Sequence, residues 1–303
     1  MTTATYCFRR AVELGPHSSP ILLRTANFEF QTGLTNDALL RLRRILTDSG
    51  EYDTIAFSLF DRLGGSTAGV LGSGLPDARR PAQAYFRHLI ARDDFASSNL
   101  VWQWMQDRRL TDKPVGLDWV NFLLSTRHLA QAQSIFVHEA GQDGGDYPDK
   151  NLLFNGDFKS KPLNSNLDWR ITPHSSVAAV VEDGALHVKF TGTENVAYAN
   201  VMHQGILTAG AYVLRAEMRS DKITTNEGVW LQLVDADSPG RLNLRTGPLT
   251  GTVPQRAERL NFTIIGEPRL IELRVMRTPS AKFDSRIAGD FWLDRVVIAP
   301  AEN

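Results

Sequence analysis

The sequence contains one cysteine, Cys7, in 303 residues, which excludes an internal disulfide framework and a cysteine-rich zinc site. Purely apolar runs are only a few residues long, as at 177–181, so no segment predicts a membrane span. The net charge is −1, from 33 Lys and Arg against 34 Asp and Glu. This balance argues against binding of nucleic acid through bulk positive charge.

Signals for secretion and catalysis are also missing. Residues 1–5 lack the basic and apolar regions of a secretory signal. The chain has no G-x-S-x-G or H-E-x-x-H motif, and its seven histidines are scattered. We therefore expect a non-enzymatic protein with no catalytic residue, no metal site and no cofactor. Because 34 carboxylates must include some near neighbours, a carbohydrate-active enzyme with an unrecognised carboxylate pair stays open as an alternative.

The two halves of the chain have different hydrophobic periodicities. Up to about residue 141, apolar residues recur every three or four positions, which is typical of amphipathic helices. From residue 151 onward, short runs alternate between apolar and polar residues, as at 212–218 and 270–275, which indicates strands with one buried face. A turn-rich segment lies between them. We predict a multidomain α plus β protein, with a helical domain at 1–145 and an antiparallel β-sandwich at 146–303.

The helical half repeats a spacing of small and large residues. The pattern A-x3-F-x2-A-x4-P at 4–16 returns 34 positions later, at 38–50, with residues of the same size classes. Shorter matches follow at 82–89 and 132–136. This period is that of the tetratricopeptide repeat, so residues 1–140 resemble such an array, an α-solenoid of helix pairs. Ala38 is then expected between helices. An unrelated helical bundle with chance spacing is the alternative.

The tetratricopeptide resemblance implies a concave surface that binds a protein partner. The residues that it would place there are Leu23, Asn27, Phe30 and Gln31. Asn27 matches one polar position of a peptide-carboxylate clamp, but Leu23 stands where that clamp would need lysine. No first helix precedes the first match, so we expect a fragment of a longer array. The glycine-rich segment 64–74 interrupts the period and is expected to be a flexible surface loop without a nucleotide site.

Motifs at both ends of the β half resemble those of a known family. N-L-L-F-N-G-D-F at 151–158 is followed by Trp169, and W-L-D-R-V-V-I stands at 292–298. L-T-A-G-A-Y-V-L occupies 207–214. Together these resemble jelly-roll carbohydrate-binding modules of the galactose-binding-like superfamily over about residues 151–299. The resemblance implies a two-sheet sandwich that binds glycan or protein, or is purely structural. Trp169 and Trp292 are expected in its core.

Alternation along the predicted strands indicates a candidate ligand site. Residues on the faces opposite the core would combine a flat apolar platform with polar groups, as sugar sites do. An alternative is that the tryptophan is covered by a loop or by the helical domain, with Arg and Glu as cross-strand pairs. The candidate residues are Trp230, Arg215, Glu217, Gln232, Glu272 and Arg274.

The family resemblance also concerns a structural calcium ion between the first and last strands. It would use an acidic residue where this chain has Lys159, together with Asp294. We therefore predict no calcium at that place, and a Lys159 ammonium beside Asp294 instead. The alternative is that Lys159 points to solvent. A second acidic segment, 235–240, lacks a closing glutamate and is expected to be a solvent turn.

The hypothesis that follows is an interaction scaffold, with helices for a protein partner and a sandwich for glycan or protein. The alternative is an accessory protein of bacterial polysaccharide synthesis or export that holds sugar in the sandwich. The compartment stays open, with a fragment of a longer envelope-associated protein as one interpretation. We expect neither nucleic acid nor direct insertion into a membrane.

Overall fold

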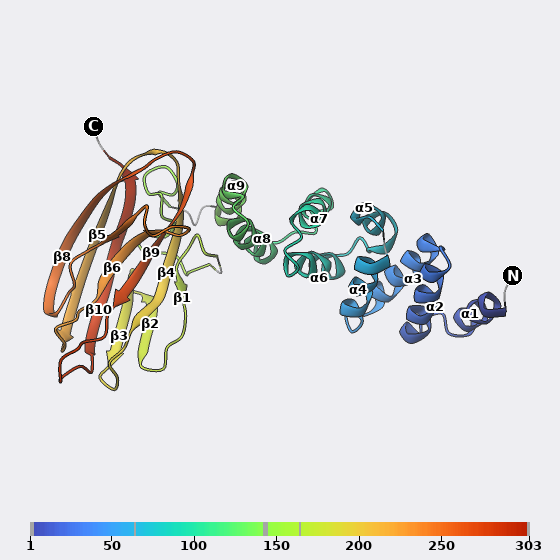
Figure 1. Cartoon of the computed structure of the whole chain (residues 1–303), viewed down its shortest axis with the longest axis horizontal. Coiled ribbons are helices and arrows are strands. Elements are labelled where there is room, and N and C mark those ends of the chain that lie inside the picture. The colour runs from blue at the N-terminus through green and yellow to red at the C-terminus, as the bar shows by residue number, and fades with distance from the viewer. Residues whose placement is uncertain (1–2, 64, 142–144, 164, 302–303) are drawn as a thin grey trace. The chain divides into compact units, whose positions relative to one another are not determined.

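The computed structural model describes residues 3–63, 65–141, 145–163 and 165–301. Helices form the N-terminal part of the chain and two antiparallel sheets form the C-terminal part, so the predicted α plus β class is confirmed (Figure 1). By packing, the chain divides after Val115 into an N-terminal unit and a C-terminal unit. The predicted domain boundary at residue 145 differs from this division, since helices that precede residue 145 are grouped with the strands. The boundary at 145 stays a prediction.

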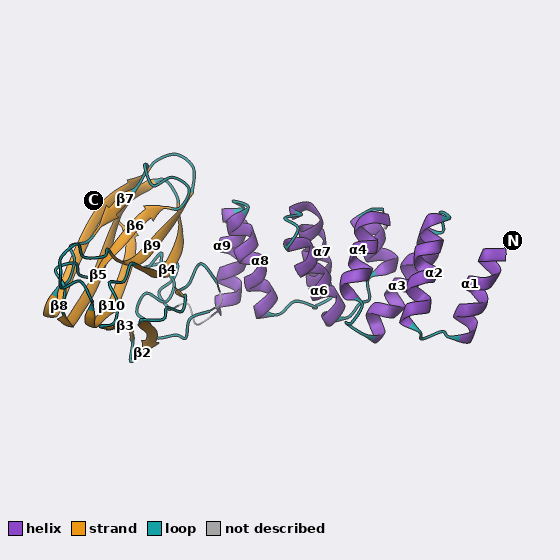
Figure 2. Cartoon of the chain, turned by 60° about the horizontal axis from the view of Figure 1, so that its bottom comes forward, coloured by secondary structure: helices purple, strands orange, loops and turns teal. Residues whose placement is uncertain are grey.

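The N-terminal unit consists of short amphipathic helices (Figure 2). Gly33, at a φ of +80°, separates the second and third helices, in the left-handed conformation that glycine adopts most readily. In chain order the helices are α1 (Thr3–Leu14), α2 (Ser19–Gln31), α3 (Thr35–Asp48), α4 (Asp53–Leu63), α5 (Thr67–Gly69), a π-helical turn (Val70–Gly74), α6 (Arg79–Ile90) and α7 (Phe95–Asp107).

Small and aromatic residues of the repeated spacing are buried. Ala38, Ala82 and Phe86 each have 0% of their surface exposed, which confirms the expected place of Ala38 between helices. The first match is different, because α1 has no fully buried residue and stacks on α2 through Phe8 and Phe28, with ring centroids 4.6 Å apart. The buried alanines agree with a packed repeat, and its assignment to the tetratricopeptide class stays a prediction.

Replacing Ala38 by tryptophan is expected to destabilise the N-terminal unit by about 1–3 kcal/mol, because the indole overfills a closed helix contact. Leu40→Trp is the matched control, since Leu40 lies on the same helix and is 49% exposed. Hydrogen exchange of the α3 amides, with and without urea, measures the difference. Equal protection in the two variants would mean that Ala38 does not limit the approach of the helices.

The glycine-rich segment after α4 is helical, so the predicted surface loop is wrong. Its described part, 65–74, contains α5 and the π-helical turn, while residue 64 lies outside the described residues. Val70 is buried, and a Cβ added to Gly74 would lie 2.9 Å from both Leu39 and Phe60. Gly74, one of the glycines that suggested a loop, instead allows a helical turn to approach α3 and α4 closely.

The C-terminal unit contains two five-stranded antiparallel sheets, which we name sheet A and sheet B (Figure 1). Sheet A has the order β1-β4-β9-β6-β7 and sheet B has the order β2-β3-β10-β5-β8. The strands are β1 (Arg170–Ile171), β2 (Val177–Glu182), β3 (Ala185–Thr191), β4 (Tyr198–Leu207), β5 (Gly210–Ile223), β6 (Trp230–Asp235), β7 (Asn243–Arg245), β8 (Gly251–Ile264), β9 (Arg269–Arg277) and β10 (Ala288–Pro300).

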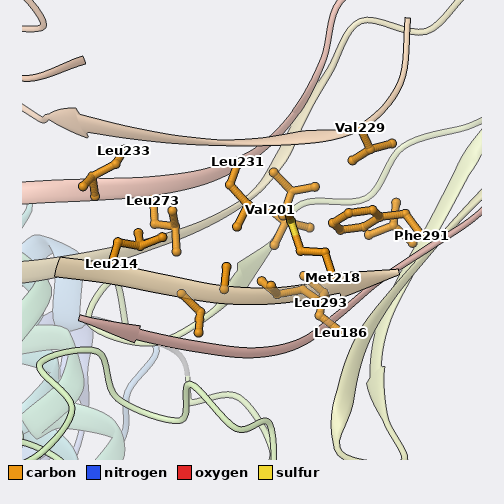
Figure 3. Close-up of a cluster of buried hydrophobic side chains, with 14 of the residues drawn as sticks. Leu186, Val201, Leu214, Met218, Val229, Leu231, Leu233, Leu273, Phe291 and Leu293 are labelled. Carbon is orange, nitrogen blue, oxygen red and sulfur yellow. The ribbon is translucent and has the colours of Figure 1, made fainter. Parts of the chain in front are cut away.

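Alternate residues of these strands meet between the sheets and form the core (Figure 3). Leu214 and Met218 of sheet B face Leu231 and Leu273 of sheet A, and all four are fully buried. Burial of such side chains is the main stabilising contribution to a sandwich. Trp169 is 1% exposed, as predicted for a core residue.

Trp292 does not lie in the core, contrary to the prediction. It is half-buried on the outer face of sheet B, where its register places it beside His187 and Arg219. The His187 ring stacks on it with centroids 4.8 Å apart, and the Arg219 guanidinium lies 4.2 Å from its centroid. The adjacent Phe291 points inward instead, because neighbouring residues of a strand point to opposite faces.

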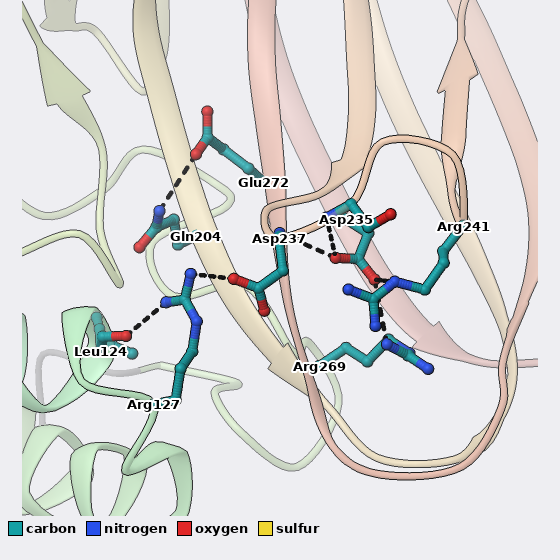
Figure 4. Close-up of polar contacts among 9 residues, drawn as sticks. Leu124, Arg127, Gln204, Asp235, Asp237, Arg241, Arg269 and Glu272 are labelled. Carbon is teal, nitrogen blue, oxygen red and sulfur yellow. Dashed lines mark hydrogen bonds and ion pairs between the residues drawn. The ribbon is translucent and has the colours of Figure 1, made fainter.

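A helical hairpin, α8 (Lys113–Ser125) and α9 (Leu129–Ala140), packs with the sandwich. The rings of Phe136 and Phe154 meet edge to face at 5.2 Å, and the Asn121 side chain accepts a hydrogen bond of 2.8 Å from the Asn166 amide. Arg127, in the turn between the helices, donates to the Leu124 carbonyl and forms an ion pair with Asp237 (Figure 4). From Gly116 onward, the hairpin therefore belongs structurally to the C-terminal unit.

Among the residues described, no helix combines the length and the apolar character needed to cross a bilayer. This agrees with the absence of long apolar runs in the sequence.

Candidate functional site

The 151–158 motif forms a seam along the end of β10. The Asn151 side chain donates to the Val296 carbonyl at 3.0 Å and accepts from the Ile298 amide at 3.0 Å. The Leu152 amide donates to the Ile298 carbonyl at 2.8 Å. One asparagine thus provides hydrogen-bond partners for backbone groups on a stretch of β10 edge that no regular strand covers. This explains why the motif begins with this residue.

Gly156 and Asn155 complete this seam. The Val296 amide donates to the Gly156 carbonyl at 2.7 Å, and a Cβ added to Gly156 would overlap the Val296 carbonyl oxygen. The Asn155 side chain bridges both backbone groups of Ser160, and its carbonyl accepts from the Trp169 indole at 3.0 Å. The close approach to Val296 requires a residue without a side chain at position 156. The hydrogen bonds of Asn155 hold the loop beside the outer face of sheet B.

This loop forms one wall of a cleft of about 490 Å³, and the floor is the outer face of β5, β8 and β10. Volumes of a few hundred Å³ suit small ligands or short segments of a polymer. Its wall includes Tyr147, whose pKa burial raises to about 12, so that the phenol is neutral at physiological pH. The charged groups of the lining include Asp157, Arg215, Glu217, Arg259 and Arg295.

Charged side chains stand opposite one another on the cleft floor. Arg215 of β5 is directly opposite Arg259 of β8, and Glu217 of β5 is opposite Arg295 of β10. The Arg259 Nε donates to the Asn261 side chain at 3.3 Å. The arrangement offers guanidinium donors beside a carboxylate acceptor, which is what recognition of a polar, hydroxyl-rich ligand requires.

The predicted pairing of Lys159 with Asp294 is wrong. The Lys159 ammonium lies 2.8 Å from the Asp157 carboxylate and its side chain is 80% exposed, whereas Asp294 accepts from Arg219 Nε at 3.1 Å. A β-bulge between Leu293 and Arg295 shifts this end of β10, so the aspartate faces β5 instead of the first loop. Bulges of this kind leave no clear signal in the sequence.

The six sequence-predicted ligand residues lie on opposite sides of the sandwich. Arg215 and Glu217 line the cleft on sheet B. The other four lie together on the outer face of sheet A, where Gln232 is opposite Arg274. Alternation correctly places all six away from the core, but it does not show to which sheet each strand belongs. The four residues on sheet A are Trp230, Gln232, Glu272 and Arg274.

The sheet A residues mainly contact one another. Trp230 is half-buried, with the Arg245 guanidinium 5.8 Å from its ring centroid. Glu272 is 6% exposed, forms an ion pair with Arg274 and accepts from Gln204 at 3.2 Å (Figure 4). Glu272 and Arg274 lie on the same strand, so their ion pair is not the cross-strand Arg–Glu pair of the alternative, whereas Gln204 contacts Glu272 from the neighbouring strand β4. The described lining of the sheet B cleft does not include Trp230.

Segment 235–240 is a turn, as predicted, but its first residue is buried instead of solvated. Asp235 is 1% exposed and lies 3.4 Å from Arg241 and 3.5 Å from Arg269, beside a cavity of about 160 Å³ (Figure 4). Its other oxygen accepts from the amides of Asp237 and Ser238. The guanidinium groups of Arg241 and Arg269 offset the negative charge of this buried carboxylate. Within the described ranges, no cluster of three or more His, Cys, Asp or Glu residues could hold a metal ion.

The candidate protein-binding residues of α2 differ in accessibility. Gln31 is exposed and Asn27 is half-buried, but Phe30 is 8% exposed and belongs to the helical core. The interpretation of Phe30 as a surface residue fails because both Phe30 and Ala26 lie on the packed face of the helix. Gln31 and Asn27 stay candidates.

Three further cleft residues, Arg259, Arg295 and Tyr147, were not predicted from the sequence. Arg295 follows the bulge in β10, so alternation counted from the buried Phe291 and Leu293 assigns it to the wrong face. Arg259 lies in an edge strand that is mostly exposed and has weak alternation. Tyr147 lies in the turn-rich segment between the halves, where periodicity carries no information.

No family model and no curated protein matches the chain. Its matches are to solved structures. A CBM4 structure has 13% identity and a TM-score of 0.34, covering 49% of this chain and 99% of that chain. TmCBM61 in complex with β-1,4-galactotriose has 17% identity and a TM-score of 0.35, and the match covers 50% of this chain and 100% of that chain. The CBM22-1 xylan-binding domain of Xyn10C from Paenibacillus barcinonensis has 8% identity and a TM-score of 0.32, and the match covers 49% of this chain and 93% of that chain.

Proposed function

We propose that the protein is a non-enzymatic binding protein whose C-terminal sandwich binds a glycan in the cleft on sheet B. The observation that carries this proposal is the cleft itself, a concavity of about 490 Å³ on a sheet face, with donors and acceptors side by side. A sugar presents hydroxyl groups that donate and accept, so a floor of alternating arginine and glutamate suits it. The 151–158 resemblance to carbohydrate-binding modules supports the same role, because those residues build the wall.

The charge states of the cleft favour binding over hydrolysis. A glycosidase needs one carboxyl group that stays protonated to act as a general acid. Burial works to raise the pKa of Asp157, but the hydrogen bond and charge of Lys159 outweigh it and bring the pKa below its ordinary value. Glu258, another carboxylate of the lining, is ion-paired with Arg256 at 2.5 Å. The lowered pKa keeps Asp157 ionised, whereas a general acid must stay protonated.

Filling the cleft is expected to abolish retention by a polysaccharide. Val297 is half-buried on the floor, opposite Arg215, so Val297→Trp places an indole where the ligand would lie. Met276→Trp, at a half-buried position on the outer face of sheet A, is the matched control. Affinity electrophoresis across neutral and acidic polysaccharides, followed by calorimetry on those that retain the parent, should show at least a tenfold loss for Val297→Trp alone.

The same assay separates this site from the one predicted from sequence. We expect Trp230→Ala to bind as the parent does, because Trp230 lies on sheet A. Loss of binding in Trp230→Ala with retention in Val297→Trp would move the site to sheet A. No retention of the parent on any polysaccharide would overturn the proposed function.

In this proposal, the helices of the N-terminal unit bind a protein partner, the role that the repeat resemblance implies. Exposed Gln31 and half-buried Asn27 are the residues that would contact it. An accessory role in bacterial polysaccharide synthesis or export would combine both functions, with the helices on a protein and the sandwich on the polymer. Asn27→Ala and Gln31→Ala together should leave glycan binding unchanged.

A further inference from the structure

We infer that the cleft ligand is an acidic glycan, one whose sugars carry carboxylate or sulfate groups; this inference rests on the proposed function. The first observation is the register of β5 and β8. Arg215 and Arg259 are directly opposite each other, and both line the cleft. Like charges directly opposite on neighbouring strands destabilise the pairing, and an anion placed between them removes the repulsion.

The second observation is the distribution of ion pairs around the cleft. Three of the carboxylates in its lining have cationic partners of their own. Asp146 lies 3.6 Å from Lys150, Asp157 lies 2.8 Å from Lys159 and Glu258 lies 2.5 Å from Arg256. The remaining carboxylate in the described lining, Glu217, accepts a hydrogen bond from Gln255 at 3.3 Å.

Arg259 and Arg295, which have no ion-pair partner among the described residues, therefore face a single remaining carboxylate. The floor carries excess positive charge although the whole chain has a net charge of −1. A concave site with this local charge attracts an anionic ligand over a neutral one.

Arg259 and Arg295 are the groups placed to hold the anion. Arg259 lines the cleft and donates through Nε to Asn261, and within the described part of the chain its terminal nitrogens have no hydrogen-bond partner. Arg295 is exposed, and among the described residues its side chain has neither a hydrogen bond nor an ion pair, although Glu217 is its register partner. Arg215 already interacts with another group and adds positive charge. Paired guanidinium donors match the two oxygens of a carboxylate or a sulfate.

The test compares acidic and neutral polymers on the intact chain. Polygalacturonate supplies carboxylates, its fully methyl-esterified form supplies the same sugars without charge, and dextran sulfate and dextran form the second pair. We expect at least tenfold tighter binding to one acidic polymer than to its neutral partner, with the favoured pair identifying carboxylate or sulfate. Arg259→Gln and Arg295→Gln should each reduce that binding at least tenfold, and Arg245→Gln on sheet A should not.

The outcomes separate the inference from the proposed function. If neutral and acidic polymers bind equally and Val297→Trp still abolishes binding, the cleft binds glycan but the acidic specificity is wrong. If both acidic polymers bind and neither arginine variant weakens them, the attraction is unspecific and the inference is overturned. If no polymer binds the parent, the proposed function and this inference fail together.

Discussion

Arg277→Met is expected to lower the unfolding free energy of the sandwich by about 3–5 kcal/mol, because a buried hydrogen-bonding centre is lost. Arg277 is 2% exposed and donates to the carbonyls of Val196, Glu227 and Ser285. It also donates to the Asn195 side chain at 2.8 Å. One guanidinium thus connects three loops, and methionine would leave their acceptors buried without a donor.

Hydrogen exchange of the β4 and β9 amides under denaturant measures this loss in the intact chain. Arg286→Met is the control, since Arg286 is exposed in the same region and its replacement should change stability by less than about 0.5 kcal/mol. Arg277→Lys should recover only part of the loss, because an ammonium cannot span the same acceptors. Similar protection in Arg277→Met and Arg286→Met would show that water replaces the guanidinium at little cost.

Acidification is expected to destabilise the sandwich through His203. Burial lowers the pKa of this imidazole from 6.5 to about 4, against the opposing effect of hydrogen bonds with the Phe154 carbonyl and the Gln204 backbone. The unfolded chain therefore takes up a proton near pH 6.5 that the folded chain takes up only near pH 4. Stability contributed by neutral His203 is complete above pH 6.5 and decreases by about 3 kcal/mol as the pH falls to 4.

The variant His203→Gln isolates this contribution, because glutamine keeps a donor for the Phe154 carbonyl but does not titrate. Urea unfolding of the sandwich at pH 7, 5.5 and 4, followed by exchange at β4, should show a flatter pH dependence than the parent. His138→Gln, on an exposed face of α9, should keep the parent's pH dependence. Identical slopes for parent and His203→Gln would mean that the pKa of His203 is the same in the folded and unfolded protein, which would contradict the expected effect of burial.

Much of the fold could be predicted because local patterns and packing agree. The three-and-four spacing around Ala38 and the alternation at 212–218 each bury the residues that the patterns assign to the core. The prediction of a loop is wrong for the described residues 65–74, since glycine is compatible both with loops and with helical turns that approach a neighbour closely. Composition alone does not distinguish these cases.

The candidate site could be predicted only in part, for a topological reason. β5 and β6 follow one another in the sequence but enter different sheets, so Arg215 and Trp230 lie on opposite sides of the sandwich. Strand order depends on long-range pairing that alternation does not reveal. The bulge before Arg295 adds a second uncertainty, because one extra residue reverses the face of everything after it.

Hydrogen exchange of the intact chain, with and without a saturating oligosaccharide from the best-retained polymer, tests the location of the site most directly. We predict that protection increases at 145–157, 213–217, 257–259 and 295–299, the segments that surround the cleft. Protection confined to 230–232 and 272–274 would place the ligand on sheet A and contradict the proposed site.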